Sequence, residues 1–137
     1  MDYQTYRDNF FTSPTPEQRF IFKGLHGTTL FYADYADAVM FYQQVLGEPA
    51  YVEGEYTRGW QIGETWLTLL KSKDGNPQNV EVMVVMQTPQ EVDKLAAAMA
   101  RAGAKGGEPE DQLMYEPVHL CSVVDPFGVN FMISCQR

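Results

Sequence analysis

The order of apolar and polar residues predicts two similar halves, each made of a strand, a helix and then further strands. In the first half, apolar residues recur at helical spacing from Ala36 to Leu46, and the pattern ends at Gly47 with Pro49 just beyond. Short runs rich in β-branched and aromatic residues, separated by glycine turns, predict the strands. These strands are expected at residues 27–33, near Tyr51, at 56–62 and at 65–71.

The second half repeats this order. Residues 80–86 form an apolar, β-branched run that predicts a strand, and a helix start follows. Thr88 is a capping residue, Pro89 takes the first helical position and Glu91 lies three residues past the cap. The apolar stripe of this helix comprises Val92, Leu95, Ala96 and Met99, and the helix is expected to end at Gly103. The last strands are expected at residues 119–124 and 129–134, joined by the turn 125–128.

The two halves constitute an internal repeat of roughly 55 residues, visible in pattern more than in identity. We therefore predict an α+β fold, with an N-terminal extension over residues 1–24 and a single domain over 25–137. Its modules span about 25–75 and 78–135. The extension has no sustained period, and its aromatic residues predict that it docks on the domain or on a partner chain. These aromatic residues are Tyr3, Tyr6, Phe10 and Phe11.

Composition narrows the classes of function. The chain has 137 residues, of which 45% are hydrophobic, enough for a packed core. Its longest apolar stretches are far too short to cross a bilayer, and its N-terminus lacks the pattern of a secretory signal, so we expect a cytoplasmic protein without a membrane partner. The formal net charge of −8, with no basic cluster, argues against binding to nucleic acid.

Few residues carry candidate chemistry. His26 and His119 are the only histidines, and we interpret them as partly exposed or hydrogen-bonded structural residues. The alternative is a site that combines both histidines with Glu81, which requires the strand register to slip by one. Cys121 and Cys135 show no metal-type spacing and are expected to be reduced and buried. We find neither a nucleophile with a base partner nor a glycine-rich phosphate loop.

Two motifs carry a family resemblance. Asp34 leads into Phe41-Tyr42-Gln43-Gln44-Val45-Leu46-Gly47, and Val124-Asp125-Pro126-Phe127-Gly128-Val129 lies near the C-terminus. With the internal repeat, they make residues 25–135 resemble the vicinal oxygen chelate superfamily, which includes glyoxalase I, extradiol dioxygenases and bleomycin-resistance proteins. The resemblance implies two βαβββ modules that form a curved mixed sheet around one pocket. It also implies a homodimer.

The metal ligands of that superfamily can be matched to this sequence through the two motifs. The resemblance places the four ligand positions at Gly27, Thr68, Glu81 and Met132, with His26 one residue early and facing the other way. Only Glu81 is a plausible ligand, so we expect no metal and no cofactor. A partly desolvated Glu81 would suit proton transfer or the binding of a cationic group and is the candidate catalytic residue; a solvent-facing Glu81 is the alternative.

If the matched positions point inward, strand alternation defines the remaining pocket residues. The predicted binding residues are Thr29, Phe31, Trp66, Thr68, Leu70, Glu81, Met83, Asn130 and Met132. The opposite faces would pack on the two helices, so both faces of the strands are expected to be covered. These opposite faces carry Leu30, Tyr32, Leu67, Leu69, Val82, Val84, Phe131 and Ile133.

An aromatic and methionine-rich lining predicts a pocket for a small, largely apolar or aromatic organic molecule, bound without a metal. Three alternatives stay open. The chain could be a metal-dependent lyase or dioxygenase of the same superfamily with atypical ligands, or a non-catalytic interaction module. The inward side chains could also simply fill the core. Whether the protein is an enzyme is left undecided by the sequence.

Overall fold

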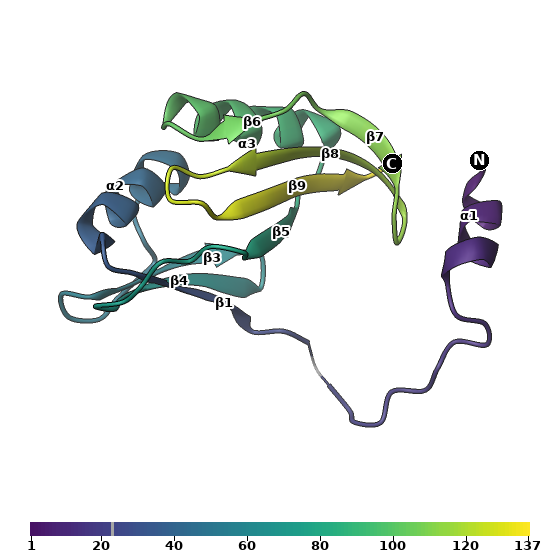
Figure 1. Cartoon of the computed structure of the whole chain (residues 1–137), viewed down its shortest axis with the longest axis horizontal. Helices are drawn as coiled ribbons and strands as arrows, with labels where there is room; N and C mark the ends of the chain where they lie inside the picture. Colours follow the sequence, from purple (N-terminus) through teal and green to yellow (C-terminus); the bar gives the residue numbers. More distant parts are fainter. Residues whose placement is uncertain (23) are drawn as a thin grey trace.

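The computed structural model describes residues 1–22 and 24–137 and shows an α+β fold with an N-terminal helix set apart from it (Figure 1). The elements of the first half are α1 (Tyr3–Phe10), β1 (Gly27–Tyr32), α2 (Tyr35–Leu46), β2 (Tyr51–Val52), β3 (Thr57–Ile62) and β4 (Thr65–Lys71). Those of the second half are β5 (Glu81–Val85), α3 (Pro89–Arg101), β6 (Lys105–Gly106), β7 (Glu110–Leu113), β8 (Pro117–Val124) and β9 (Asn130–Gln136).

The strands form two sheets with the same order. The first sheet runs β1-β4-β3-β2 and the second runs β5-β9-β8-β6, with β7 also paired to β8. In each sheet the first strand is parallel to its neighbour, β1 to β4 and β5 to β9. The predicted repeat is thus confirmed in topology. The expected single curved sheet is instead two sheets, and the polar connection after α3 contains the short strands β6 and β7, which the sequence pattern did not indicate.

The helix ends follow local chemistry. The Thr88 hydroxyl accepts a hydrogen bond from the backbone N–H of Glu91 at 3.2 Å, so the predicted cap of α3 is confirmed. Gly47 ends α2 with φ +88°, a conformation that favours glycine, and its N–H donates to the carbonyl of Gln43. Asp34 occupies the N-cap position of α2, but its side chain makes no capping hydrogen bond there.

One face of the strands is buried and the other is largely open. The eight residues predicted to face the helices are all buried. On the opposite face the side chains of Phe31, Met83 and Val85 are 48%, 49% and 72% exposed. The expectation that both faces are covered is therefore wrong for a single chain, because α2 and α3 each cover only one side of their sheet.

A buried carboxylate joins the two halves. Asp125, in the turn between β8 and β9, is 4% exposed. One of its oxygens accepts hydrogen bonds from the hydroxyls of Tyr42 at 2.6 Å and Tyr32 at 3.2 Å. The other accepts from the backbone N–H groups of Phe127 and Val129, each at 2.8 Å. The turn between β8 and β9 in the second half is thereby hydrogen-bonded to both β1 and α2 of the first half.

Aromatic packing surrounds this carboxylate. The ring of Phe127 contacts Tyr32 edge-on at a centroid distance of 5.4 Å and Phe41 at 6.3 Å. Tyr42 packs against Phe131 at 6.2 Å. Burial raises the pKa of Tyr42, and the nearby Tyr32 and Asp125 raise it further, so its hydroxyl stays a proton donor. Burial likewise raises the pKa of Tyr32.

The N-terminal extension contains a helix that the sequence pattern did not predict. Asp2 caps α1 by accepting a hydrogen bond from the N–H of Thr5 at 2.8 Å. The helix buries none of its residues, which is why no apolar stripe marked it in the sequence. It reaches the turn between β7 and β8, where the Tyr3 hydroxyl donates to the carbonyl of Tyr115 and the ring of Phe11, just after the helix, meets that of Tyr115.

Two further expectations concern the chain as a whole. Cys121 and Cys135 are both free and buried, as predicted. Among the described residues, no helix combines the length and the hydropathy that a bilayer crossing requires.

Replacement of Asp125 by Asn should destabilise the fold by about 3 kcal/mol, because the amide cannot accept hydrogen bonds at both former oxygen positions. In thermal unfolding this corresponds to a loss of roughly 10 °C in Tm. Asp34→Asn is the matched control, since Asp34 is exposed and makes no capping bond, and its Tm should stay unchanged. Equal stability of Asp125→Asn and wild type would contradict the role given to this carboxylate.

Candidate binding site

The predicted binding residues lie in two patches, one on each sheet. In the first sheet the strand pairing sets Thr29 beside Thr68 and Phe31 beside Leu70, with Trp66 next on the same face. We call these five residues the first patch. In the second sheet Glu81 lies beside Asn130 and Met83 beside Met132, and these four form the second patch. The faces assigned from the sequence therefore agree with the observed register, but the two patches belong to separate sheets.

Glu81 lies at the exposed start of β5. Its neighbour across the strands, Asn130, is exposed as well. The carboxylate therefore takes the solvent-facing position that was the alternative in the sequence analysis. The partial desolvation on which its proposed role in proton transfer depended is not found in the single chain.

The main cavity lies instead between the two halves, where residues of α2, α3, β4 and β5 line it. It has a volume of about 690 Å³, within the range of small-molecule sites. We call it the groove. Of the nine predicted residues, only Trp66 and Met83 line it. Its lining is Thr28, Tyr42, Val45, Leu46, Ile62, Gly63, Thr65, Trp66, Leu67, Val82, Met83, Val84, Val85, Met86, Gln87, Thr88, Glu91, Leu95, Met99 and Phe131.

Incomplete burial of helix residues creates the groove. Val45 and Leu46 on α2 and Leu95 on α3 pack against the core but remain only half-buried. Sequence reasoning missed this site because it expected the pocket inside the curved sheet, on the strand face opposite the helices. The apolar residues at the end of α2 were the available signal, since they extend the stripe by a turn beyond Tyr42.

Polar groups lie along one side of the groove. Thr88 and Glu91 come from the first turn of α3, Gln87 precedes them, and Thr65 comes from the start of β4. Glu91 is the only carboxylate in the lining and is half-buried. The hydroxyl of Tyr42 is committed to Asp125. The arrangement thus offers one anionic acceptor and several neutral hydrogen-bonding groups around an apolar floor.

The donor set does not fit a metal ion. Across residues 1–22 and 24–137, no three histidine, cysteine, aspartate or glutamate side chains lie close enough together to hold one. Of the positions matched to the superfamily's ligands, Gly27 has no side chain, and Thr68 and Met132 are not the histidine or carboxylate ligands such sites use. His119 and Glu81 lie on opposite faces of the second sheet, so the alternative site that combined them with His26 is not assembled.

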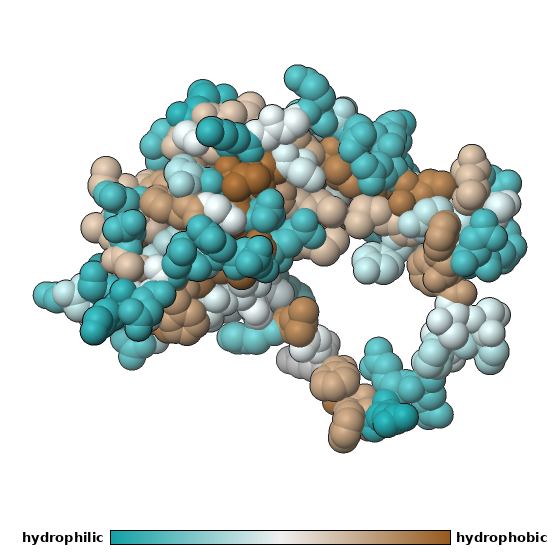
Figure 2. Space-filling model, in the orientation of Figure 1, coloured by the Kyte–Doolittle hydropathy of each residue, from teal (hydrophilic) through white to brown (hydrophobic). Residues whose placement is uncertain are grey.

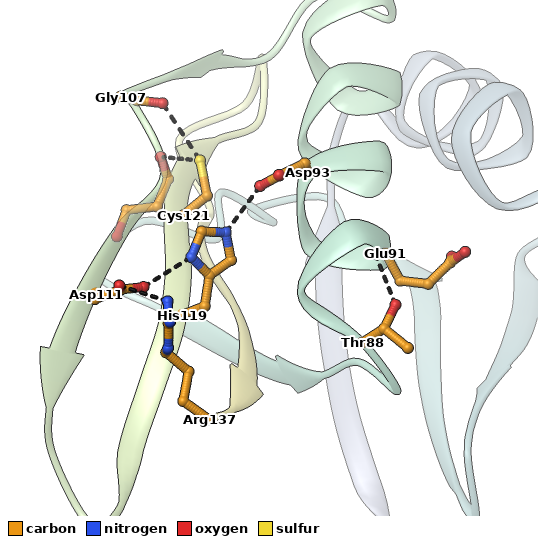
Figure 3. A network of polar contacts seen from close by, with 9 residues as sticks. Thr88, Glu91, Asp93, Gly107, Asp111, His119, Cys121 and Arg137 are labelled. Carbon is orange, nitrogen blue, oxygen red and sulfur yellow. Dashed lines mark hydrogen bonds and ion pairs between the residues drawn. The ribbon is translucent and has the colours of Figure 1, made fainter.

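His119 has a structural environment of its own on β8 (Figure 3). Its Nε2 lies 3.0 Å from an Asp93 oxygen on α3, and its Nδ1 lies 3.0 Å from an Asp111 oxygen on β7. The second Asp111 oxygen accepts a hydrogen bond from Arg137 at 2.5 Å. His119 therefore links the outer side of α3 to the edge of the second sheet, as expected for a hydrogen-bonded structural histidine.

The stabilisation that His119 gains from Asp93 and Asp111 depends on pH. Hydrogen bonds to Asp93 and Asp111 raise the pKa of His119 above its ordinary value of 6.5. Because the folded-state pKa is the higher one, the stabilisation is fully present below pH 6.5 and is lost as the pH rises through the folded value. Hydrogen bonds from His119 and Arg137 lower the pKa of Asp111.

An NMR titration of the histidine ring signals should give His119 a pKa above 6.5. Asp93→Asn and Asp111→Asn should each lower that pKa, since each removes one anionic partner of the imidazolium. Asp37→Asn, at an exposed position of α2, is the control and should leave it unchanged. A wild-type pKa at or below 6.5 would show that Asp93 and Asp111 do not stabilise the charged form of His119.

Comparison with known proteins identifies the scaffold. The family model of the Glyoxalase/Bleomycin resistance protein/Dioxygenase superfamily matches residues 24–133. A search of curated protein sequences finds no match.

Solved structures share the fold at low sequence identity. A virulence protein from Salmonella typhimurium is 17% identical with a TM-score of 0.68, covering 86% of this chain and 100% of its own. A glyoxalase/bleomycin resistance protein/dioxygenase family enzyme from Burkholderia phytofirmans is 20% identical with a TM-score of 0.65, covering 82% and 98%. A lactoylglutathione lyase from Agrobacterium tumefaciens is 14% identical with a TM-score of 0.62, covering 82% and 93%.

At these identities the structures establish the fold but not the reaction. The family model, in contrast, spans both repeated halves and the two motifs around Tyr42 and Asp125. This chain belongs to the glyoxalase/bleomycin resistance/dioxygenase superfamily.

Proposed function

We propose that this protein binds a small, largely apolar or aromatic organic molecule in the groove between its two halves. The single observation that carries the proposal is the groove itself, about 690 Å³ of space with a mainly apolar lining. Sites of this size accommodate drug-sized molecules and remove most of their surface from water. The proposal involves no metal, because the described side chains provide no group of ligands for one.

The apolar part of the ligand would lie between the helices and the strands. Leu95 and Met99 of α3 form one wall and Leu46 of α2 forms another. Trp66 and Met83, which were predicted from the sequence, supply an aromatic and a thioether surface to the same space. Flat or aliphatic groups bind well to such surfaces, because methionine adapts to irregular shapes and aromatic rings add large contact areas.

The polar part of the ligand would be recognised from the start of α3. Glu91 is the one carboxylate of the lining, so it favours a hydroxyl or cationic group on the ligand. Thr65 and Gln87 add hydrogen-bonding groups that fix orientation. The ionisable group paired with Glu91 is the exposed ammonium of Lys94, 3.9 Å away on the same helix. A single carboxylate paired in this way supports binding rather than acid–base turnover, which normally needs a matched donor and acceptor.

Two features of the sequence analysis belong to the same proposal. We place the binding activity in the cytoplasm, and we expect the protein to act as a homodimer, as the family resemblance implies. The seven predicted binding residues that lie outside the groove would contact a ligand only if another surface enclosed their patches. These residues are Thr29, Phe31, Thr68, Leu70, Glu81, Asn130 and Met132.

A thermal-shift screen of aromatic and aliphatic amines, alcohols and neutral analogues should yield stabilising compounds, whose Kd is then measured by calorimetry. Leu95→Gln should weaken binding at least about tenfold, because it places an amide in the apolar wall and removes buried contact area. Glu91→Gln should weaken binding of amines but leave that of neutral analogues unchanged.

Ala97→Gln is the matched control, because Ala97 lies on the exposed side of the same helix. It should leave both the Kd and the unfolding temperature as in the wild type. If Leu95→Gln lowers stability, Ile62→Gln tests the opposite side of the groove. If the Kd of the compounds is the same in the wild type and in all of these groove variants, the binding site lies elsewhere. A screen that yields no stabilising compound would overturn the proposed function.

A further inference from the structure

The groove runs along one edge of β5. Seven consecutive residues line it, from Val82 in β5 to Thr88 just before α3. Successive side chains of a strand point to opposite faces of the sheet, so a cavity that touches all of them must lie beside the strand, at its edge. The other edge of β5 is paired with β9, and within residues 1–22 and 24–137 no strand pairs with the edge at the groove (Figure 1). The groove is therefore bordered by a strand edge that is free to form hydrogen bonds.

The hydrogen bonds between β5 and β9 show which backbone groups of β5 remain free. The carbonyl of Val80 accepts a hydrogen bond from the β9 side at 3.0 Å, and the N–H of Met86 donates to that side at 2.7 Å. In a parallel ladder alternate residues of one strand bond to the same neighbour, so Val80, Met86 and the even-numbered residues between them bond to β9. The N–H and C=O groups of the intervening residues point to the opposite edge. Those of Met83 and Val85 thus face the groove.

The free groups of Met83 and Val85 repeat at the spacing of a peptide backbone. Two positions along a strand correspond to about 6.6 Å. An extended peptide presents its own donors and acceptors to one side with the same period. Addition of such a peptide to a free strand edge is a recurring form of recognition, in which the backbone provides affinity and alternate side chains provide specificity. A ligand without amide groups would leave most of these donors and acceptors unpaired.

The walls of the groove favour apolar side chains on the peptide. A strand added to β5 continues the sheet, so its side chains point alternately to the two faces. Leu95 and Met99 of α3 form an apolar wall, and Trp66 of the first half forms another. Glu91 is the only charged residue in the lining, so a peptide with several charged side chains would lose hydration without gaining partners.

Glu91 indicates the direction of the peptide. It lies in the first turn of α3, which follows the carboxyl end of β5. Its carboxylate can accept hydrogen bonds from a free amino terminus, and a peptide with its amino end there runs antiparallel to β5. Antiparallel pairing is also the slightly more stable arrangement per residue. Lys94 lies 3.9 Å from Glu91, but both side chains are exposed and such a pair contributes little, so Glu91 stays available.

The N-terminal extension of the chain leaves the groove open. None of its described residues lines the groove. Figure 2 shows open space between much of the extension and the domain. Free strand edges are normally protected by charge or proline, and residues 82–85 of β5, VMVV, provide neither. The edge is therefore accessible to a ligand from outside the chain.

We propose that the groove binds a short apolar peptide with a free amino terminus, which adds to the second sheet as an extra strand antiparallel to β5. The inference rests on the proposed function, because it uses the same groove, and it names the chemical class of the ligand. The backbone groups of Met83 and Val85 hold the peptide, the apolar walls select its side chains, and Glu91 orients its amino end.

Peptide analogues test the strand pairing on the unaltered protein. Pentapeptides of leucine, valine and phenylalanine, with a free amino end and an amidated carboxyl end, are screened by thermal shift, and the Kd of the best is measured by calorimetry. N-methylation of a single amide removes its N–H. At alternate positions it should weaken binding at least about tenfold, and between them it should leave the Kd unchanged, because only every second N–H faces β5. A loss at every position, or at none, would overturn the proposal.

A proline in β5 tests the same contact from the protein side. Val85→Pro removes an N–H that faces the groove and keeps the hydrogen bonds to β9, so the fold should persist. Peptide binding should weaken at least about tenfold. Val52→Pro is the matched control, because Val52 is exposed on the edge strand β2 and outside the groove lining, and its Kd should equal that of the wild type. If Val85→Pro unfolds, the N-methyl series on the wild type decides.

Acetylation of the amino end separates the role of Glu91 from that of the strand edge. The acetylated peptide should bind the wild type about tenfold more weakly than the free amine, and it should bind Glu91→Gln and the wild type equally. An acetylated peptide that binds the wild type as tightly as the free amine would contradict the proposed direction. If small apolar amines bind in the groove but no peptide does, this inference is wrong and the proposed function stands. If neither binds, both are wrong.

Discussion

The structure depends on one buried carboxyl group and the four hydrogen-bond donors that surround it. Within residues 1–22 and 24–137 Asp125 forms no ion pair; two backbone N–H groups of its own turn and the hydroxyls of Tyr32 and Tyr42 donate hydrogen bonds to it. Because the donors come from both halves, the carboxylate fixes the position of β1 and α2 against the second sheet. A buried carboxylate is unfavourable unless its hydrogen bonds are complete, so this junction tolerates little displacement.

The groove follows directly from that junction. Tyr42 and Phe131, which pack together beside Asp125, also line the inner end of the groove. Tyr42 belongs to α2 and Phe131 to β9, so the contact that joins the two halves also borders the cavity. The apolar cavity is therefore a consequence of how the halves are joined, and its polar side is added by the first turn of α3.

The sequence predicted most elements of the fold, since their signals are local. Thr88 and Gly47 marked helix ends by their hydrogen-bonding and backbone preferences, and the strand faces followed from alternation. Helix α1 was not predicted because it has no buried apolar stripe. Strands β6 and β7 were not predicted because their residues are mostly polar and they are held in place by hydrogen bonds to β8. The role of Asp125 in joining the halves needed tertiary contacts across more than eighty positions.

The candidate site was predictable only in part. Trp66 and Met83 were found because the family motifs and strand alternation both pointed to their strands, whereas Leu95 was noted only as part of the apolar stripe of its helix. Whether a half-buried residue fills a core or lines a cavity depends on the distance between the packed helices. The spacing of apolar residues along the sequence does not reveal that distance. The burial of Glu81 could not be predicted from the sequence either, since it depends on what covers that face of the sheet.

Helix α3 has one side in each of two environments. Its inner side contributes Glu91, Leu95 and Met99 to the groove, and its outer side holds His119 through Asp93. A guest that displaces the helix by a fraction of an ångström must alter the geometry between Asp93 and the imidazole. The NMR signals of the His119 ring should therefore report on whether the groove is occupied, although His119 does not line the groove and lies on the other side of α3.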